Sequence, residues 1–291
     1  MAHLSASLAP DGTLRAWRTR IAVPSAGQEF GRRLIRGDGP LKAMLDSAGE
    51  ADPFVTEGAV PPYAIPNLAV ERVACQTGLP GGRMRGGAHG YTAFFTECFI
   101  DELARKAMAE PLSYRMAMLG HDLRLAECLT RVASLAQWDG GLAASGQGLA
   151  CHRMGPVETG GAIAVIATAR RAEDGGIRVS RIAAVADIGR IINIDIARQQ
   201  IEGGLLFGLG LAAGASTGYS RGMPDISRLS ALSLPLLADT PMIDVAFVDS
   251  AAPPFDPGEI GVAAVAPAVA NALFSATGLR SRSLPLLRDA V

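Results

Sequence analysis

One carboxylate stands on a glycine-flanked turn directly before an apolar, helix-like segment. The turn is Pro257-Gly258-Glu259-Ile260-Gly261, and the apolar segment reaches Phe274. The glycines allow a sharp turn and the close approach of a ligand, and the first N–H groups of the helix point into the same space. This arrangement is typical of a catalytic base. Taken alone it favours a simpler interpretation, in which Glu259 complements the helix dipole by about 0.3–1 kcal/mol.

The length of 291 residues suggests about two domains. Hydrophobic residues make up 49% of the chain. No run of about 18 uninterrupted apolar residues occurs, so no membrane-spanning helix is expected. The start, Met1 to Ser5, has neither a basic region nor an apolar run, which predicts no secretion signal. We therefore expect a protein of the cytoplasm, or one that is exported together with a partner.

The charge of the chain argues against nucleic acid as a partner. It carries 27 basic and 28 acidic residues, so no field of a single sign attracts nucleic acid or an anionic membrane. The four Tyr and nine Phe are not interleaved with basic residues, as a single-strand-binding surface requires. Neither nucleic acid nor an anionic membrane is therefore favoured as a partner; a small-molecule substrate is what the family resemblance described below implies.

The cysteines predict no metal centre made by this chain alone. They are far apart and form no C-x-x-C pair: Cys75, Cys98, Cys128 and Cys151. An iron–sulfur cluster or a structural zinc site is therefore not expected. Cys98 and Cys128 fall on apolar helix faces, which predicts that both are buried. Electrons from any redox reaction would have to leave through another chain.

Residue patterns predict the main elements. Apolar residues spaced by three or four predict helices over residues 94–109 and 124–138, the first with an Asp101–Arg105 pair. Two runs rich in Ile, Val and Ala, residues 161–170 and 177–188, predict a hairpin, and alternation at 243–247 predicts another strand. A further helix follows Asn193, with Asp195 as its cap.

Glycine-rich segments supply the remaining candidates for a binding site. Gly81 to Gly87 places Arg83 and Arg85 in a loop that offers N–H groups and a guanidinium to an anion. The alternative is an ordinary solvated loop. In residues 200–204, the Gln200 amide can donate to and accept from a heterocycle, and the nearby helix glycines predict close packing against backbone or a cofactor. A third segment, residues 145–150 with Gln147, is read as a flexible loop or a linker.

Taken in order, the motifs resemble the molybdenum-cofactor-binding large subunit of the xanthine dehydrogenase and aldehyde oxidase family, most of all its isoquinoline 1-oxidoreductase beta-subunit branch. The matching segments are collinear and cover most of the chain: Trp17 to Ser25, Arg85 to Ala104, Ala186 to Asn193, Gln200 to Leu209 and Gly258 to Pro285. The resemblance covers only the C-terminal portion of such a subunit.

The resemblance implies an α+β fold of the aldehyde oxidase and xanthine dehydrogenase type, with two subdomains of mixed sheet and helices. Residues 1–110 would be the remainder of a first molybdopterin-binding subdomain, and residues 111–291 the second. The cofactor would be a molybdenum–molybdopterin, with the cytosine dinucleotide form as one option. The electron partner would be an iron–sulfur or cytochrome subunit, and another chain would carry the missing N-terminal half.

The resemblance also implies roles for particular residues. Family members hydroxylate aldehydes or N-heterocycles with oxygen from water. Glu259 matches the general base, and Arg85 matches a loop arginine that steadies developing charge. The cofactor-binding candidates are Gly86, Gly87, Gln200, Gly203 and Gln147.

Two other interpretations stay open. The chain is alternatively an inactive, truncated remnant or scaffold that keeps the fold and binds a partner chain. A third reading is a phosphate or nucleotide binder that uses Gly81 to Gly87. The sequence does not identify the substrate or the electron acceptor.

Overall fold

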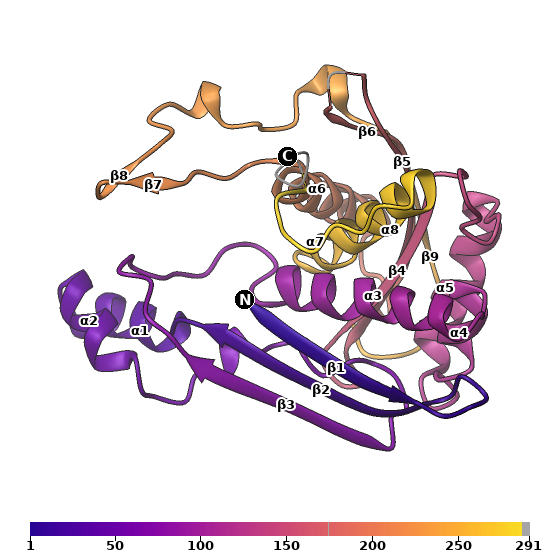
Figure 1. Cartoon of the computed structure of the whole chain (residues 1–291), viewed down its shortest axis with the longest axis horizontal. Helices are drawn as coiled ribbons and strands as arrows, with labels where there is room; N and C mark the ends of the chain where they lie inside the picture. The colour runs from indigo at the N-terminus through magenta and orange to yellow at the C-terminus, as the bar shows by residue number, and fades with distance from the viewer. Residues whose placement is uncertain (174, 287–291) are drawn as a thin grey trace.

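Two β-sheets organise the chain, and helices pack between and around them (Figure 1). The computed structural model describes residues 1–173 and 175–286. The smaller sheet contains β1 (Ala2–Leu8), β2 (Leu14–Val23) and β3 (Asn67–Ala74) in that order. The larger sheet has the order β4 (Gln147–Met154), β5 (Gly161–Arg171), β6 (Ile177–Asp187) and β9 (Met242–Phe247). The α+β prediction is therefore confirmed.

The larger sheet is buried on both faces because each face is covered by helices. On β5, Ile163 and Val165 belong to a core with α6 (Ile194–Ala213) and α8 (Val265–Thr277). The alternate residues, such as Ile166, face α5 (Leu123–Ala136) and a second core. Side chains on a strand alternate between faces, so a strand covered on both sides reads as a continuous apolar run.

Buried polar groups join α8 to the helix α3 (His89–Lys106). The Glu97 carboxylate of α3 accepts hydrogen bonds from Arg115 Nε at 2.9 Å, the Tyr63 hydroxyl at 2.6 Å and the Cys151 N–H at 2.9 Å. Arg115 lies in α4 (Pro111–Met116) and Cys151 in β4. The Asn271 amide of α8 donates to the Leu149 carbonyl at 3.0 Å. This junction fixes α3 and α8 on the edge of the larger sheet.

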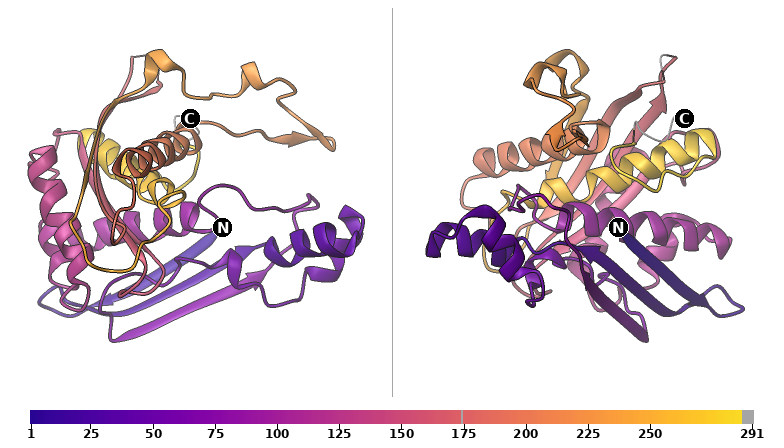
Figure 2. Two further views of the ribbon diagram at one scale, coloured as in Figure 1. Left: turned by 180° about the vertical axis from the view of Figure 1, so that it is seen from behind. Right: turned by 60° about the vertical axis from the view of Figure 1, so that its left-hand side comes forward.

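Two segments project on the same side of the molecule (Figures 1 and 2). One is the pair α1 (Gly27–Arg36) and α2 (Pro40–Ser47), which follows β2 and precedes the short helix η1 (Pro53–Val55). The other, residues 214–241, is called the arm below. It contains β7 (Tyr219–Ser220), β8 (Met223–Pro224), η2 (Leu229–Ala231) and η3 (Leu237–Asp239). The loop of residues 75–88 runs between these two projections.

Most predicted elements are confirmed with shifted ends. The helix predicted over residues 94–109 is α3, which begins five residues earlier, and its Asp101–Arg105 pair is present at 3.2 Å. The predicted hairpin is β5 and β6, which pair antiparallel. Cys98 and Cys128 are buried, as predicted.

Two local predictions are wrong. The cap of α6 is Asn193, whose Oδ1 accepts the N–H of Ile196 at 3.0 Å, while Asp195 lies in the first helical turn. Asn193 keeps an extended backbone, as an N-cap requires, so the helix begins before Asp195. Residues 147–150 are not a loop, because Gln147 begins β4 and pairs with Thr168 on β5.

The segment Ile260–Thr277 is apolar and long enough to cross a membrane by composition alone, with a mean hydropathy of 1.6. It comprises α7 (Ile260–Ala263) and α8, and 83% of it is buried inside the protein. Its apolar character is therefore that of a core helix packed on β4 and β5.

Candidate functional site

Arg85 contacts two segments that lie far from it in the sequence, the start of α6 around Gln200 and the turn around Gly258. Its Nε donates to the Gly258 carbonyl at 2.7 Å, and its Nη2 donates to the Gln200 carbonyl at 3.0 Å. The same Nη2 lies 3.4 Å from the Gln200 side-chain oxygen. The glycine-rich loop, α6 and the turn before α7 therefore meet at one guanidinium. A planar guanidinium presents several N–H groups in a fixed geometry and can hold two carbonyls at once.

Glu259 is the N-cap residue of α7, but its side chain makes no capping hydrogen bond. The turn is instead held by Asp256, whose Oδ1 accepts the N–H of Gly258 at 2.9 Å. Glu259 is exposed in this chain. The carboxylate is thus available to a ligand, and any water-excluding wall around it has to come from elsewhere.

Glycines bring α6 and α7 into backbone contact at this site. A Cβ on Gly208 would lie 2.7 Å from the Val262 carbonyl oxygen, and one on Gly261 would lie 2.7 Å from the Ile201 carbonyl oxygen. No side chain fits at such distances. The prediction that the α6 glycines pack closely against backbone is confirmed for Gly204 as well, where the Gly261 Cα would be 3.1 Å away.

The predicted glycines of the loop and of α6 lie beside Arg85. Gly86 has a φ of 90° and touches Val262 so closely that an added Cβ would be 2.7 Å from a Val262 methyl group. Gly87 has a φ of 51° and donates its N–H to the Met84 carbonyl at 2.9 Å. A side chain on Gly203 would come within 3.4 Å of the Arg85 guanidinium.

A cavity of about 220 Å³ lies next to these residues, bounded by the loop, α6, α7 and the segment after α8. Its lining includes Met84, Arg85, Tyr91, Ser216, Val262 and Leu284. Ligand and cofactor pockets usually measure about 300–1,000 Å³. The chain by itself therefore encloses only part of a site for a large cofactor.

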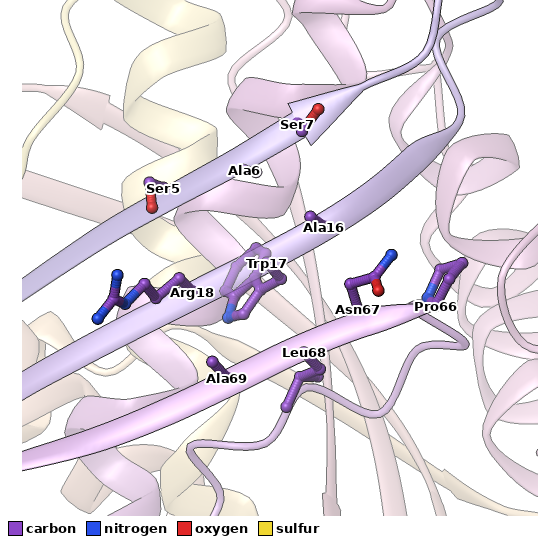
Figure 3. A pocket seen from close by; sticks show the side chains of 10 residues that line it. All are labelled: Ser5, Ala6, Ser7, Ala16, Trp17, Arg18, Pro66, Asn67, Leu68 and Ala69. Carbon is purple, nitrogen blue, oxygen red and sulfur yellow. The ribbon is translucent and has the colours of Figure 1, made fainter.

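A larger surface hollow lies elsewhere, on the smaller sheet, where Figure 3 shows residues of β1, β2 and the region around β3. Its charged lining residue, Arg18, is paired with Glu71 at 2.6 Å. Trp17 belongs to the buried core. A shallow hollow over an ion-paired sheet face offers little chemistry, so the smaller cavity at Arg85 is the candidate site.

Glu57 is a second carboxylate near this site, and no sequence motif predicted its presence there. Burial raises its pKa, Arg83 opposes that effect, and the charge of Glu259 raises the pKa further. Arg83 Nη2 lies 3.7 Å from Glu57 Oε2. Glu57 is about two hundred residues from Glu259 in the sequence and lies in no glycine-rich motif, so no local signal connects the two.

A pair of histidines lies behind the loop. Nδ1 of His89, the first residue of α3, is 2.8 Å from Nε2 of His152 on β4. Burial lowers the pKa of His89 to about 4, with Arg83 adding to the effect. Burial also places the pKa of His152 well below its usual value. The pair is therefore neutral at physiological pH and ties the start of α3 to the larger sheet.

Gln147 does not join this cluster. Its side-chain oxygen accepts the Asp139 N–H at 3.1 Å, and its carbonyl accepts the hydroxyl of Ser275 at the far end of α8. A helix of 13 residues is about 20 Å long, so Gln147 and Glu259 lie at opposite ends of α8. Gln147 therefore lies apart from Arg85, which contacts the Gln200 and Gly258 carbonyls.

Among residues 1–173 and 175–286, no three His, Cys, Asp or Glu side chains are grouped as metal ligands.

Comparisons with known proteins show what the chain is similar to. Residues 153–241 match the molybdopterin cofactor-binding domain. The isoquinoline 1-oxidoreductase subunit beta of Brevundimonas diminuta is 25% identical over 238 residues, which cover 81% of this chain and 30% of that protein. The membrane-bound aldehyde dehydrogenase of Gluconacetobacter polyoxogenes, whose name specifies pyrroloquinoline quinone, is 29% identical over 227 residues, covering 70% of this chain and 29% of that protein.

A solved structure shows the same fold. The aldehyde oxidoreductase from Desulfovibrio desulfuricans superposes with a TM-score of 0.72 at 16% sequence identity, covering 98% of this chain and 47% of that one. Residues 153–241 therefore match the molybdopterin cofactor-binding domain, and the chain as a whole has the fold of the aldehyde oxidoreductases. It corresponds to part of their large subunits and spans 29–30% of the length of the two curated relatives.

Proposed function

We propose that this chain is the C-terminal part of the large subunit of a molybdenum hydroxylase, with Glu259 as its general base. The observation that carries the proposal is the Arg85 guanidinium, which holds the Gly258 and Gln200 carbonyls together. The Glu259 side chain, one residue beyond Gly258, is exposed and makes no capping hydrogen bond.

The residues present fit the polar edge of a molybdopterin. The cavity presents the Arg85 guanidinium and Ser216 to a polar group, and glycines at 87, 90 and 208 let a flat cofactor approach the backbone. Of the predicted cofactor-binding residues, Gly86, Gly87, Gln200 and Gly203 lie beside Arg85. Because the cavity is small, we expect the rest of the cofactor to be held by the part of the large subunit that this chain does not contain.

The bound cofactor would supply a water-derived oxygen and accept the electrons of the oxidised substrate. Glu259 would accept the proton of that water, and its position at the start of α7 keeps the carboxylate near the helix N–H groups. Arg85 would hold the Glu259 turn at a fixed distance from the loop. Burial and the nearby charge of Glu259 raise the pKa of Glu57 above its usual value, although Arg83 opposes the rise.

The substrate class proposed is an aldehyde or an electron-poor N-heterocycle, and electrons would pass to an iron–sulfur or cytochrome subunit. The proposed division into residues 1–110 and 111–291 places Arg85 in the first subdomain and Gln200 with Glu259 in the second, so the cofactor would lie between them.

Elemental analysis tests the proposal directly. The native complex, purified with this chain from its own host, should contain about one molybdenum atom per chain and should reduce a dye with an aldehyde or N-heterocycle. A complex without molybdenum, or one that contains pyrroloquinoline quinone instead, would overturn the proposal. A folded complex without metal or activity would favour the alternative of an inactive scaffold.

A further inference from the structure

The two-helix segment α1–α2 exposes most of its large apolar side chains, while the buried residue of α1 is a glutamate. The buried residue of α1 is Glu29, and those of α2 are Ala43 and Ser47. The exposed residues of the pair include five large apolar side chains: Phe30, Leu34, Ile35, Leu41 and Leu45. A surface helix of a complete protein normally buries its apolar side. Large exposed apolar patches on a protein surface mark interaction sites.

The inward side of α1 is polar because it holds the loop that carries Arg85. Glu29, only 2% exposed, accepts the Gly81 N–H at 2.7 Å, and Arg33 donates to the Gly81 carbonyl. Arg33 Nε also lies 3.3 Å from Glu29 Oε1. The inner side of α1 is thus fully used by the loop, and nothing in the described residues covers the outer side.

The arm presents a second apolar surface on the same side of the molecule. Its exposed large side chains include Tyr219, Met223, Leu229, Leu236 and Leu237. In both Figure 1 and the left view of Figure 2, the arm and α1–α2 project in the same direction, and the loop of residues 75–88 lies between them. An occupant that covers both surfaces would therefore also cover the open side of the candidate site.

We propose that α1–α2 and the arm form the docking surface for the polypeptide that carries the rest of the large subunit, an inference that rests on the proposed function. The two curated relatives are more than three times as long as the part this chain spans. The cavity at Arg85 is smaller than a cofactor pocket. A second copy of this chain would add no residues that the chain does not already contain, whereas the remaining polypeptide would supply the missing wall.

The two lysines of the chain make this surface easy to map. Lys42 is exposed on α2, within the proposed surface, and Lys106 is exposed at the end of α3. The chain is purified from its natural host with an affinity tag and treated with an amine-reactive cross-linker. Mass spectrometry should find Lys42, and not Lys106, linked to a polypeptide whose sequence aligns with the remainder of the large subunits.

A matched pair of variants tests the surface itself. Leu34→Glu introduces a charge at a side chain that is 69% exposed on α1, and Leu123→Glu does the same at one that is 73% exposed on α5, on the opposite side. Leu34→Glu should reduce recovery of the polypeptide by about tenfold or more, because a charge in an apolar interface is costly. Leu123→Glu should leave recovery unchanged, and circular dichroism should show both variants folded.

The other possible outcomes contradict either the proposed surface or the proposed function. Equal recovery with both variants, Lys42–Lys42 links in a homodimer, or the absence of any such polypeptide overturns the proposed surface. Molybdenum is measured in the same fractions. A complex that forms through α1–α2 but lacks the metal overturns the proposed function alone, whereas a molybdenum-containing complex unaffected by Leu34→Glu overturns the surface alone.

Discussion

The α3–α8 junction and the α1–α2 segment differ in which side chains they bury and which they expose. At the junction, Glu97 and Arg115 are buried, and each is matched by partners within the chain. In α1–α2, a carboxylate is also buried, but the apolar side chains around it face outward. The difference shows that the larger sheet and its helices pair their buried polar groups within the chain, whereas the side near the candidate site leaves large apolar side chains exposed.

The largest effect is expected at the junction. Arg115→Ala leaves the Glu97 carboxylate buried without its cation, which should lower the free energy of unfolding by about 3–5 kcal/mol. Urea denaturation measures the loss. Arg131→Ala is the control, since Arg131 and Glu127 form an exposed pair on α5 whose removal should cost less than about 1 kcal/mol. Equal losses would contradict the view that the junction carries the fold.

The histidine pair between the start of α3 and β4 predicts a pH dependence of stability. Burial holds the pKa of His89 at about 4, compared with 6.5 for an ordinary histidine. Between these values the unfolded chain binds more protons than the folded one, so the free energy of unfolding falls as the pH falls. The loss between pH 7 and pH 5 should be about 2 kcal/mol for His89 alone.

Urea denaturation of two variants at pH 7 and pH 5 checks this prediction. His152→Gln removes one titrating ring from the pair and should shrink the loss of stability on acidification. His3→Gln, on the exposed side of β1, should leave the loss as in the wild type. If His152→Gln shows the same loss as the wild type, the pair is not the source of the pH dependence.

Two glycines, one in α6 and one in α1, sharpen the comparison with a smaller effect. Gly208→Ala forces a methyl group against the Val262 carbonyl oxygen, which should cost about 1–2 kcal/mol after the gain in helix propensity. Gly31→Ala in α1 meets no atom within 4 Å, so it should stabilise the chain by about 0.5–1 kcal/mol. Thermal unfolding of both variants measures the difference. A stabilising Gly208→Ala would show that α6 and α7 do not need backbone contact.

Patterns of neighbouring residues predicted the helices and the hairpin correctly. The periodicity of α3 and α5 and the β5–β6 hairpin could be read directly, because helix and strand spacing are properties of neighbouring residues. The meeting of Arg85, Gln200 and Glu259 was anticipated only through the collinear resemblance to a known family.

Features that depend on contacts between distant parts of the chain were not predicted from the sequence. Residues around Gln147 looked like a loop because of their glycines, yet pairing with β5 makes them a strand. Glu57 reaches the Glu259 region only through the tertiary fold. The outward apolar side of α1–α2 was not predicted either, since a pattern of apolar residues does not say which side is covered.

The most direct test of the central claim is the Glu259→Gln variant of the native complex. If Glu259 is the general base of the site held by Arg85, substrate-dependent dye reduction should fall by about 10²–10⁴-fold while the molybdenum content stays at the wild-type level. Glu173→Gln, an exposed carboxylate beyond the end of β5, serves as the control and should retain full activity. Unchanged turnover in Glu259→Gln would contradict the account.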